Sequence, residues 1–171
     1  MPLYALGNRT PTIHPDAFVH PDAVVIGDVR IGAESSIWPS AVLRGDYGTI
    51  IVGERTSIQD GAIIHAVPEY PTVIGSDCVI GHLAHLEGCV IEDRALVGSG
   101  AIVLHRATVH SGATVGAGAV VRNRMDVPAN ALAVGVPAII KVDASGSDSI
   151  VENAATYVAN AHWYQRELRE L

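Results

Sequence analysis

Branched apolar residues recur every six positions along most of the chain, and small side chains usually stand four positions after them. The series is interrupted at residues 46–49 and 68–71, and it loses one position just before Ile91. A period of six is typical of a narrow solenoid, in which branched side chains fill the interior and small residues sit where the chain turns. An ordinary β-sandwich has strands of varied length and turns about every 8–12 residues, so it does not explain a strict period of six. The repeated positions are Ile13, Val19, Val25, Ile31, Ile37, Leu43, Val52, Ile58, Ile64, Ile74, Ile80, Leu86, Ile91, Val97, Val103, Val109, Val115, Val121, Val127 and Ala133.

This hexapeptide pattern resembles that of the left-handed parallel β-helix, a triangular prism with three hexads in each coil. The left-handed sense is implied by the resemblance and does not follow from the period itself. Twenty hexads make between six and seven coils, which cover about residues 12–136. We therefore expect an all-β fold, a left-handed parallel β-helix, whose domain occupies residues 1–143.

The pattern changes near the C-terminus, where apolar residues fall three or four positions apart from Ile150 onward. This spacing predicts an amphipathic helix. Ser149 followed by Glu152 is typical of a capping box at the start of such a helix. The small and polar residues 144–147 predict a linker. We expect residues 144–171 to form this linker and a C-terminal α-helix that packs back on the prism, mainly as a structural cover.

The composition also favours strands. The chain has 22 Val, 16 Ile, 23 Ala and 17 Gly, whereas Phe, Trp and Tyr together make up 5% of it and Phe18 is the single Phe. β-Branched residues favour strands, and a helical bundle would rely on Leu and aromatic residues instead. Disorder is excluded because 49% of the residues are hydrophobic and only 17% are charged.

Charge and cysteine content narrow the class of protein further. The net charge is −7 and no basic run stands out, which disfavours nucleic acid because phosphate binding needs clustered cations. No stretch of about 18 apolar residues exists, so no transmembrane helix is predicted. The N-terminus does not resemble a signal peptide, and two cysteines do not make a disulfide framework. We therefore expect a soluble, cytoplasmic protein with neither nucleic acid nor membrane as a partner.

The register places several polar residues on the outside of the prism, because hexads three apart stack on the same face. Arg44, His65 and Glu87 each follow a stacked interior position, so strand alternation points them outward in one column over successive coils. Asp60 and His82 form a second column on the preceding face. The histidines and carboxylates of both columns approach neighbouring edges of the same two coils.

Imidazole and carboxylate groups of this kind suit Zn²⁺ or another borderline divalent metal. Two outward columns on different faces of one prism do not readily bind the same metal ion. A neighbouring copy around a three-fold axis would bring the first column of one chain against the second column of the next. We therefore predict a homotrimer with shared sites, formed by His65 and Glu87 from one chain and His82 from the next. His85 lies close to Glu87. The remaining histidines lack such company and are interpreted as non-functional: His14, His20, His105, His110 and His162.

Together these residues resemble the γ-class carbonic anhydrase family over nearly the whole chain. The hexapeptide repeat alone is shared with many acyltransferases, so the polar motifs at this spacing are the more specific part. The motifs are Arg44-Gly45-Asp46, Ser57-Ile58-Gln59-Asp60, His65, and Gly81-His82 leading to Gly88-Cys89, with Ile37-Trp38-Pro39, Val134-Gly135-Val136-Pro137-Ala138 and the C-terminal helix as flanking matches.

The resemblance implies a homotrimer with three interfacial metal sites that hold Zn²⁺, or alternatively Fe²⁺ or Co²⁺. It implies the reversible hydration of CO₂ to bicarbonate as the reaction at these sites. It also implies that Arg44 and Asp46 pair with each other across the trimer interface.

The same resemblance implies catalytic roles near the metal. Gln59 would hold the metal-bound hydroxide, and Asp60 would lie in the site beside it. The tail tyrosine that some members bring near the metal matches Tyr157, with Tyr164 as the competitor. The best-studied members carry a long acidic loop that aids proton transfer, whereas the loop at residues 66–71 is short, which argues against fast hydration.

One departure from the family pattern concerns the metal ligands. Glu87 stands where the family has a third His, five residues after His82. The predicted ligands are therefore His65, His82 and Glu87, with His85 as the alternative to Glu87, and a weakened or empty site is the third outcome. A carboxylate ligand lowers the positive charge at the metal, so the bound water would be less acidic than with three His ligands.

Three hypotheses for the function follow. The first is metal-assisted hydration of CO₂. The second is transfer or hydrolysis of the acyl group of a coenzyme A thioester, which the lack of a protruding loop with a catalytic His disfavours. The third is a non-catalytic trimer that binds metal for assembly or ligand binding, which the departure at Glu87 and the short loop favour.

Overall fold

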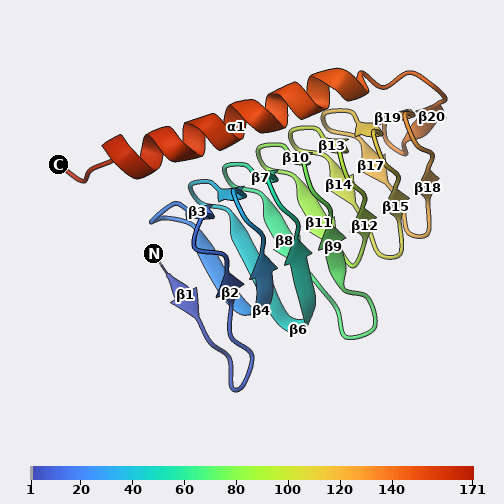
Figure 1. Cartoon of the computed structure of the whole chain (residues 1–171). Helices are drawn as coiled ribbons and strands as arrows, with labels where there is room; N and C mark the ends of the chain where they lie inside the picture. The colour runs from blue at the N-terminus through green and yellow to red at the C-terminus, as the bar shows by residue number, and fades with distance from the viewer. Residues whose placement is uncertain (1) are drawn as a thin grey trace.

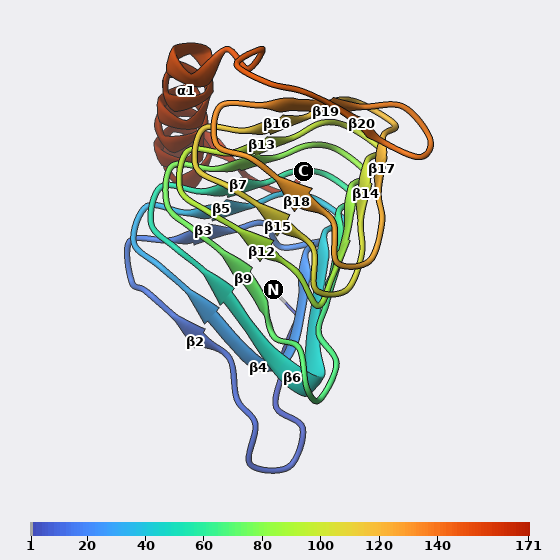
Figure 2. The ribbon, with the colours of Figure 1, turned by 90° about the vertical axis from the view of Figure 1, so that its right-hand side faces the viewer.

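Residues one coil apart lie side by side in this protein and exchange backbone hydrogen bonds as parallel strands. The computed structural model describes residues 2–171, and Met1, the first residue of the predicted domain, lies outside the described residues. The coils stack into a solenoid with one helix along its side (Figure 1) and a triangular outline when seen along the stack (Figure 2). The predicted all-β, left-handed parallel β-helix with a C-terminal helix is therefore confirmed.

The strands form two sheets, and most strands are only two or three residues long. The twelve-stranded sheet consists of β1 (Leu3–Tyr4), β2 (Thr12–Ile13), β4 (Val24–Ile31), β6 (Val42–Val52), β8 (Ile63–His65), β9 (Thr72–Ile74), β11 (His85–Glu87), β12 (Val90–Ile91), β14 (Ile102–Val103), β15 (Thr108–Val109), β17 (Val120–Val121) and β18 (Asp126–Val127). The eight-stranded sheet consists of β3 (Phe18–Val19), β5 (Ser36–Ile37), β7 (Ser57–Ile58), β10 (Val79–Ile80), β13 (Leu96–Val97), β16 (Thr114–Val115), β19 (Leu132–Val134) and β20 (Ile139–Lys141).

The interior is filled by the repeated branched positions, as the period predicts. All of them are buried except Ile13 and Val19, which lie in the first coil and are partly exposed. A coil of about 18 residues encloses too little space for a ring, so the buried aromatic residues Phe18 and Trp38 pack outside this core in a separate cluster. Cys78 and Cys89 are both buried and form no disulfide.

The first interruption of the repeat is not a loop. Residues 46–49 lie within β6, which pairs with β8 at its start and with β9 at its end and so carries the sheet around a corner. Gly45 makes this course possible, because a Cβ there would lie 2.5 Å from the carbonyl oxygen of Asp28 in the coil below. The second interruption is a short loop closed by a bridge between Val67 and Tyr70.

The C-terminal helix α1 (Ser147–Glu167) runs along the stack and packs on the prism through Ile150, Ala154 and Ala161. The predicted capping box is wrong, because the helix begins three residues earlier, with Gly146 in place of Ser149 as its N-cap and no side-chain cap. Ser149 lies in the first turn, and its hydroxyl donates to the carbonyl of Gly146 at 2.6 Å. No helix within residues 2–171 is both long and apolar enough to cross a bilayer.

An aromatic cluster fixes the helix on the eight-stranded sheet. Trp38 is 5% exposed, and its indole N–H donates to Ser36 and Ser57, each at 3.0 Å. The rings of Tyr157 and Tyr164 lie 5.8 and 5.0 Å from the Trp38 ring, centroid to centroid. The helix is thus held by edge-on ring contacts, which are stronger than their buried area alone implies.

His110 links strands of three coils. Its Nδ1 lies 3.0 Å from Glu92 and its Nε2 2.8 Å from Asp126. The hydrogen bond to Asp126 and the charge of Glu92 raise the pKa of His110 above its ordinary value, outweighing the effect of burial. The role of His110 in this structure is therefore to join coils.

We predict that His110→Gln destabilises the protein more at low pH than at high pH. A raised pKa in the folded state adds stability that is fully present below the unfolded pKa of about 6.5 and is lost as pH rises through the folded value. The cost should be about 0.2–1 kcal/mol at pH 5.5, since both carboxylates are partly exposed, and smaller at pH 9. Urea unfolding at the two pH values measures it, and a cost independent of pH would contradict the argument.

Candidate functional site

Strands β6, β8 and β11 bring three polar residues of successive coils into one column. Arg44 pairs in register with His65, and His65 with Glu87. All three are partly buried on the outer surface of the twelve-stranded sheet. The column predicted from the hexapeptide register is therefore confirmed.

His65 lies between two carboxylates. Its Nδ1 is 2.8 Å from Glu87 Oε1, and its Nε2 is 3.0 Å from Asp46 Oδ1. Arg44 donates to the other oxygen of Asp46 in the same chain. The imidazole is only 13% exposed, so these contacts fix its orientation.

Both carboxylates are held in the ionised form. The hydrogen bond from His65 lowers the pKa of Glu87 below its ordinary value, with the nearby charge of His105 contributing. Burial alone would raise the pKa of Asp46, but hydrogen bonds from His65 and Arg44 outweigh it and lower that pKa. A positive charge that develops on the His65 ring therefore lies between two negative charges.

Two further histidines approach Glu87. His85 Nε2 lies 3.5 Å from one carboxylate oxygen of Glu87, and His105 Nε2 lies 3.6 Å from the other. His85 lies on the same strand two residues before Glu87, and the choice between the two as a metal ligand remains a prediction. The expectation that His105 lies apart from the predicted ligands is wrong. His105 lies at the corner one coil above Glu87, and its side chain reaches Glu87 diagonally. If the sheet register continued by one residue, the partner of Glu87 would be Leu104 and not His105. Strand alternation therefore does not predict the contact between His105 and Glu87.

The second column is also present. His82 Nδ1 lies 2.9 Å from Asp60 Oδ2, and both side chains are about half exposed. Gln59 precedes Asp60 and is almost fully buried. Burial raises the pKa of Tyr157, and the negative charge of Asp60 raises it further. The assignment of Tyr157, rather than Tyr164, to this site remains a prediction.

The two columns belong to different sheets. His65 and Glu87 lie on β8 and β11, whereas Asp60 and His82 follow β7 and β10. Within residues 2–171, no three His, Cys, Asp or Glu side chains converge so as to hold a metal ion. A metal site that uses His82 with His65 and Glu87 requires a second copy of the chain, and it remains a prediction.

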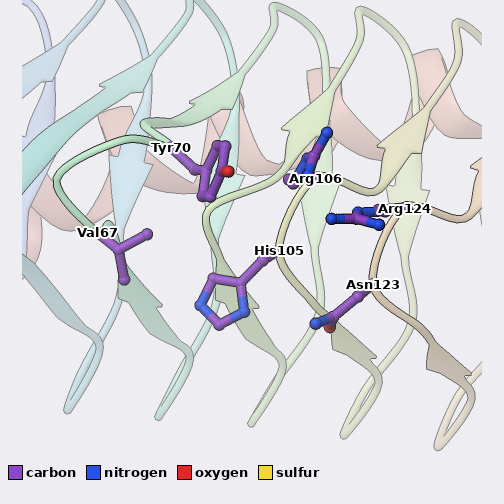
Figure 3. A pocket seen from close by; sticks show the side chains of 6 residues that line it. All are labelled: Val67, Tyr70, His105, Arg106, Asn123 and Arg124. Atoms are coloured by element: carbon purple, nitrogen blue, oxygen red, sulfur yellow. The ribbon is translucent and has the colours of Figure 1, made fainter.

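An open cavity of about 540 Å³ (Figure 3) is linked to the first column by one residue. His105 belongs to both, since it contacts Glu87 and also lines the cavity. The hexapeptide register does not predict this cavity, although its two arginines are 18 residues apart, which is the length of one coil. Its lining residues are Val67, Tyr70, His105, Arg106, Asn123 and Arg124.

A left-handed solenoid of hexapeptide repeats with a polar column on its outer face defines a class of repeat proteins that includes acyltransferases. The chain belongs to the family described as bacterial transferase hexapeptide (six repeats), which it matches over residues 10–45, 71–103 and 88–123. This family is broader than the γ-class carbonic anhydrases, so the finer resemblance remains a prediction.

Three similar proteins illustrate the range of this family. The carnitine operon protein CaiE of Escherichia coli O157:H7 is 49% identical over 104 residues, 61% of this chain and 53% of its own length. The chain spans about half the length of the curated relatives it matches. A Bacillus cereus protein suggested to be an acetyltransferase has a TM-score of 0.94 and 33% identity over 97% of this chain and 98% of its own. Perosamine N-acetyltransferase of Caulobacter crescentus, in a complex with CoA and GDP-perosamine, has a TM-score of 0.59 and 30% identity over 78% of this chain and 57% of its own.

We predict that Glu87→Gln lowers the free energy of unfolding at pH 7 by about 1 kcal/mol, because it removes a charge-assisted hydrogen bond from a partly buried imidazole. Urea unfolding at one protein concentration measures this loss. The matched control is Glu69→Gln, which removes the same charge from an exposed loop residue. Equal effects of the two substitutions would mean that Glu87 does not hold His65.

Proposed function

We propose that the chain is the subunit of an enzyme that transfers or hydrolyses the acyl group of a coenzyme A thioester. The observation that carries the proposal is the imidazole of His65, fixed between Asp46 and Glu87 on the outer face. An open cavity, lined by the His105 that contacts Glu87, leaves room for a substrate near this column. Membership of a transferase family and likeness to an N-acetyltransferase bound to CoA support it.

The proposed reaction uses His65 as a general base. The hydroxyl, amine or water acceptor attacks the thioester carbonyl carbon while the imidazole accepts its proton. The carbon–sulfur bond then breaks, and the proton passes to the thiolate, which leaves as the free thiol of CoA. Water as the acceptor gives hydrolysis, and an amine or alcohol gives transfer.

The two carboxylates have different parts in this step. Glu87 accepts the N–H of Nδ1 and orients the ring, as the buried Asp does in a Ser-His-Asp triad. Asp46 faces Nε2. While Nε2 donates to Asp46, both ring nitrogens carry a proton, so the ring must lose this proton and be released by Asp46 before Nε2 can act as a base. Arg44 gives Asp46 an alternative partner, which makes this release possible. His65 therefore replaces the protruding catalytic loop that the sequence lacks.

We expect His65→Gln to lower turnover of acyl-CoA by about 10²–10⁴-fold, the usual contribution of a general base. Release of free thiol from a series of acyl-CoA thioesters, with and without added amines, measures the rate. His14→Gln is the control, since it changes an exposed histidine far from the column. No thiol release by the wild-type chain, or equal rates in all three proteins, would contradict the proposal.

A second candidate is metal-assisted hydration of CO₂, favoured by one observation. His65 with Glu87 and His82 with Asp60 stand in the two columns that the carbonic anhydrase resemblance requires. Imidazole and carboxylate ligands suit Zn²⁺ or Fe²⁺. One ring nitrogen of His65 must first lose its hydrogen bond to a carboxylate before it can bind the metal.

When bound, such a metal lowers the pKa of its water so that hydroxide forms near neutral pH. The chain's own residues would position the reactants: Gln59 would hold the hydroxide, Asp60 would take up a proton, and Tyr157 would stand near the metal. A homotrimer is required because the two columns lie on different faces.

Complementation between variants tests the shared metal site. We expect zinc-loaded or iron-loaded wild type to carry one metal per chain, and His65→Gln and His82→Gln each to lose it. Trimers refolded from a mixture of the two variants should regain one site per mixed trimer, because one interface then joins an intact His65 to an intact His82. Metal analysis and light scattering measure this.

Stopped-flow hydration on the same samples tests the reaction. Metal that survives either single substitution, or no recovery in the mixture, would contradict the shared site. Bound metal without hydration in either the zinc or the iron form would contradict carbonic anhydrase activity and favour the non-catalytic assembly instead.

A further inference from the structure

Two arginines are stacked at one corner of the prism. The backbone N–H of Arg106 donates to Gly88 at 2.7 Å, and that of Arg124 donates to His105 at 3.0 Å, so the two residues occupy the same turn in consecutive coils. Both have left-handed backbone angles, with φ of 64° and 63°. Coils are about 4.8 Å apart, so the two side chains leave the corner side by side.

Neither arginine forms an ion pair with any carboxylate among residues 2–171. Another corner shows the contrast, because there Arg55 is stacked against Asp77 with contacts of 2.8 and 3.0 Å. The chain has 18 acidic residues and 11 basic ones, so carboxylates are not scarce. Two adjacent guanidinium groups repel each other unless an anion lies between them.

The surroundings hold Arg106 in a defined position. Its guanidinium carbon lies 5.3 Å from the centroid of the Tyr70 ring, a cation–π distance. Gly88 allows this packing, because a Cβ at that position would lie 2.9 Å from the His105 ring and 3.1 Å from Tyr70. The guanidinium plane is therefore oriented before any ligand arrives.

Apart from Val67, the residues that line the cavity in front of these arginines carry hydrogen-bond donors, and none of them is a carboxylate (Figure 3). The two guanidinium groups supply planar forks of N–H donors, and the Asn123 amide and the His105 imidazole stand beside them. Their formal charge of +2 matches a phosphate group, which carries about −1.5 to −2 at pH 7. A carboxylate, with one charge and two oxygens, would leave half of this charge unmatched.

We propose that this pocket binds the phosphate group of a small phosphorylated ligand, held by Arg106 and Arg124. His105 connects the pocket to the first column, since its Nε2 is 3.6 Å from Glu87. A ligand anchored here by its phosphate extends along the face that carries His65. The inference concerns binding alone and does not depend on the proposed acyl chemistry.

The phosphate can belong to a nucleotide such as the end of coenzyme A, or to a separate phosphorylated molecule. The chemistry that recognises it is the same. The experiment therefore first tests the phosphate site with inorganic phosphate and then distinguishes the two sources.

Calorimetric titration of the full chain with inorganic phosphate at constant ionic strength tests the site. We expect saturable binding to the wild type and at least a tenfold weaker affinity in the double variant Arg106→Gln/Arg124→Gln. Arg94→Gln should bind like the wild type, because Arg94 has the same left-handed backbone at another corner, with φ of 58°. No binding to the wild type, or equal affinity in all three proteins, would overturn the proposal.

A measurement on the wild type keeps the test valid if the double variant does not fold. Phosphate should protect Arg106 and Arg124, but not Arg94, from modification by phenylglyoxal, as read by peptide mass spectrometry. Unprotected Arg106 and Arg124 would also overturn the proposal. Competition with adenosine 3′,5′-bisphosphate then identifies the source: an affinity at least tenfold above that of inorganic phosphate assigns the pocket to a nucleotide, and an affinity no higher than that of phosphate assigns it to another phosphorylated ligand.

Discussion

The hydrogen-bond ladder between coils is the constraint on which the rest of this structure depends. It stacks Ile64, Leu86 and Val103 directly above one another, all fully buried, and leaves the interior no space for a ligand. Because coils are about 4.8 Å apart, side chains at the same position of successive coils point the same way and contact each other, whereas neighbours along a strand point to opposite faces. Every group with chemistry must therefore lie on an outer face or at a corner, and the coil length decides which groups meet.

Much of the fold and part of the site can be predicted from the sequence because the ladder is periodic. The register alone places Arg44, His65 and Glu87 in one column, and strand alternation points them outward. Side chains at the corners of the prism do not alternate between inside and outside as they do on strands. The approach of His105 to Glu87 and the stacking of Arg106 and Arg124 therefore cannot be predicted from strand alternation. The start of the helix depends on local backbone geometry around Gly146, which a Ser-x-x-Glu pattern does not determine.

The ladder also restricts charge. Like charges at stacked positions would repel at close range, and carboxylates here enclose a basic group from both sides. Such arrangements join coils and orient the central ring at the same time. The two examples are Asp46–His65–Glu87 and Glu92–His110–Asp126. The stacked Arg106 and Arg124 depart from this rule, which is why an external anion, and not a side chain, is the partner that their corner needs.

Arg44 determines which chemistry His65 can perform. An imidazole has two nitrogens, and the structure uses Nδ1 for Glu87 and Nε2 for Asp46. A base needs Nε2 free while Glu87 stays in place, whereas a metal bound by both His65 and Glu87 needs their mutual contact broken. In the single chain Arg44 pairs with its own Asp46, but the family resemblance implies a pair across subunits. An assembly in which the partner's arginine draws Asp46 away would free Nε2 at the interface. Assembly would then control the reactivity of His65 as a base, whereas metal binding by His65 and Glu87 together also requires their own contact to break.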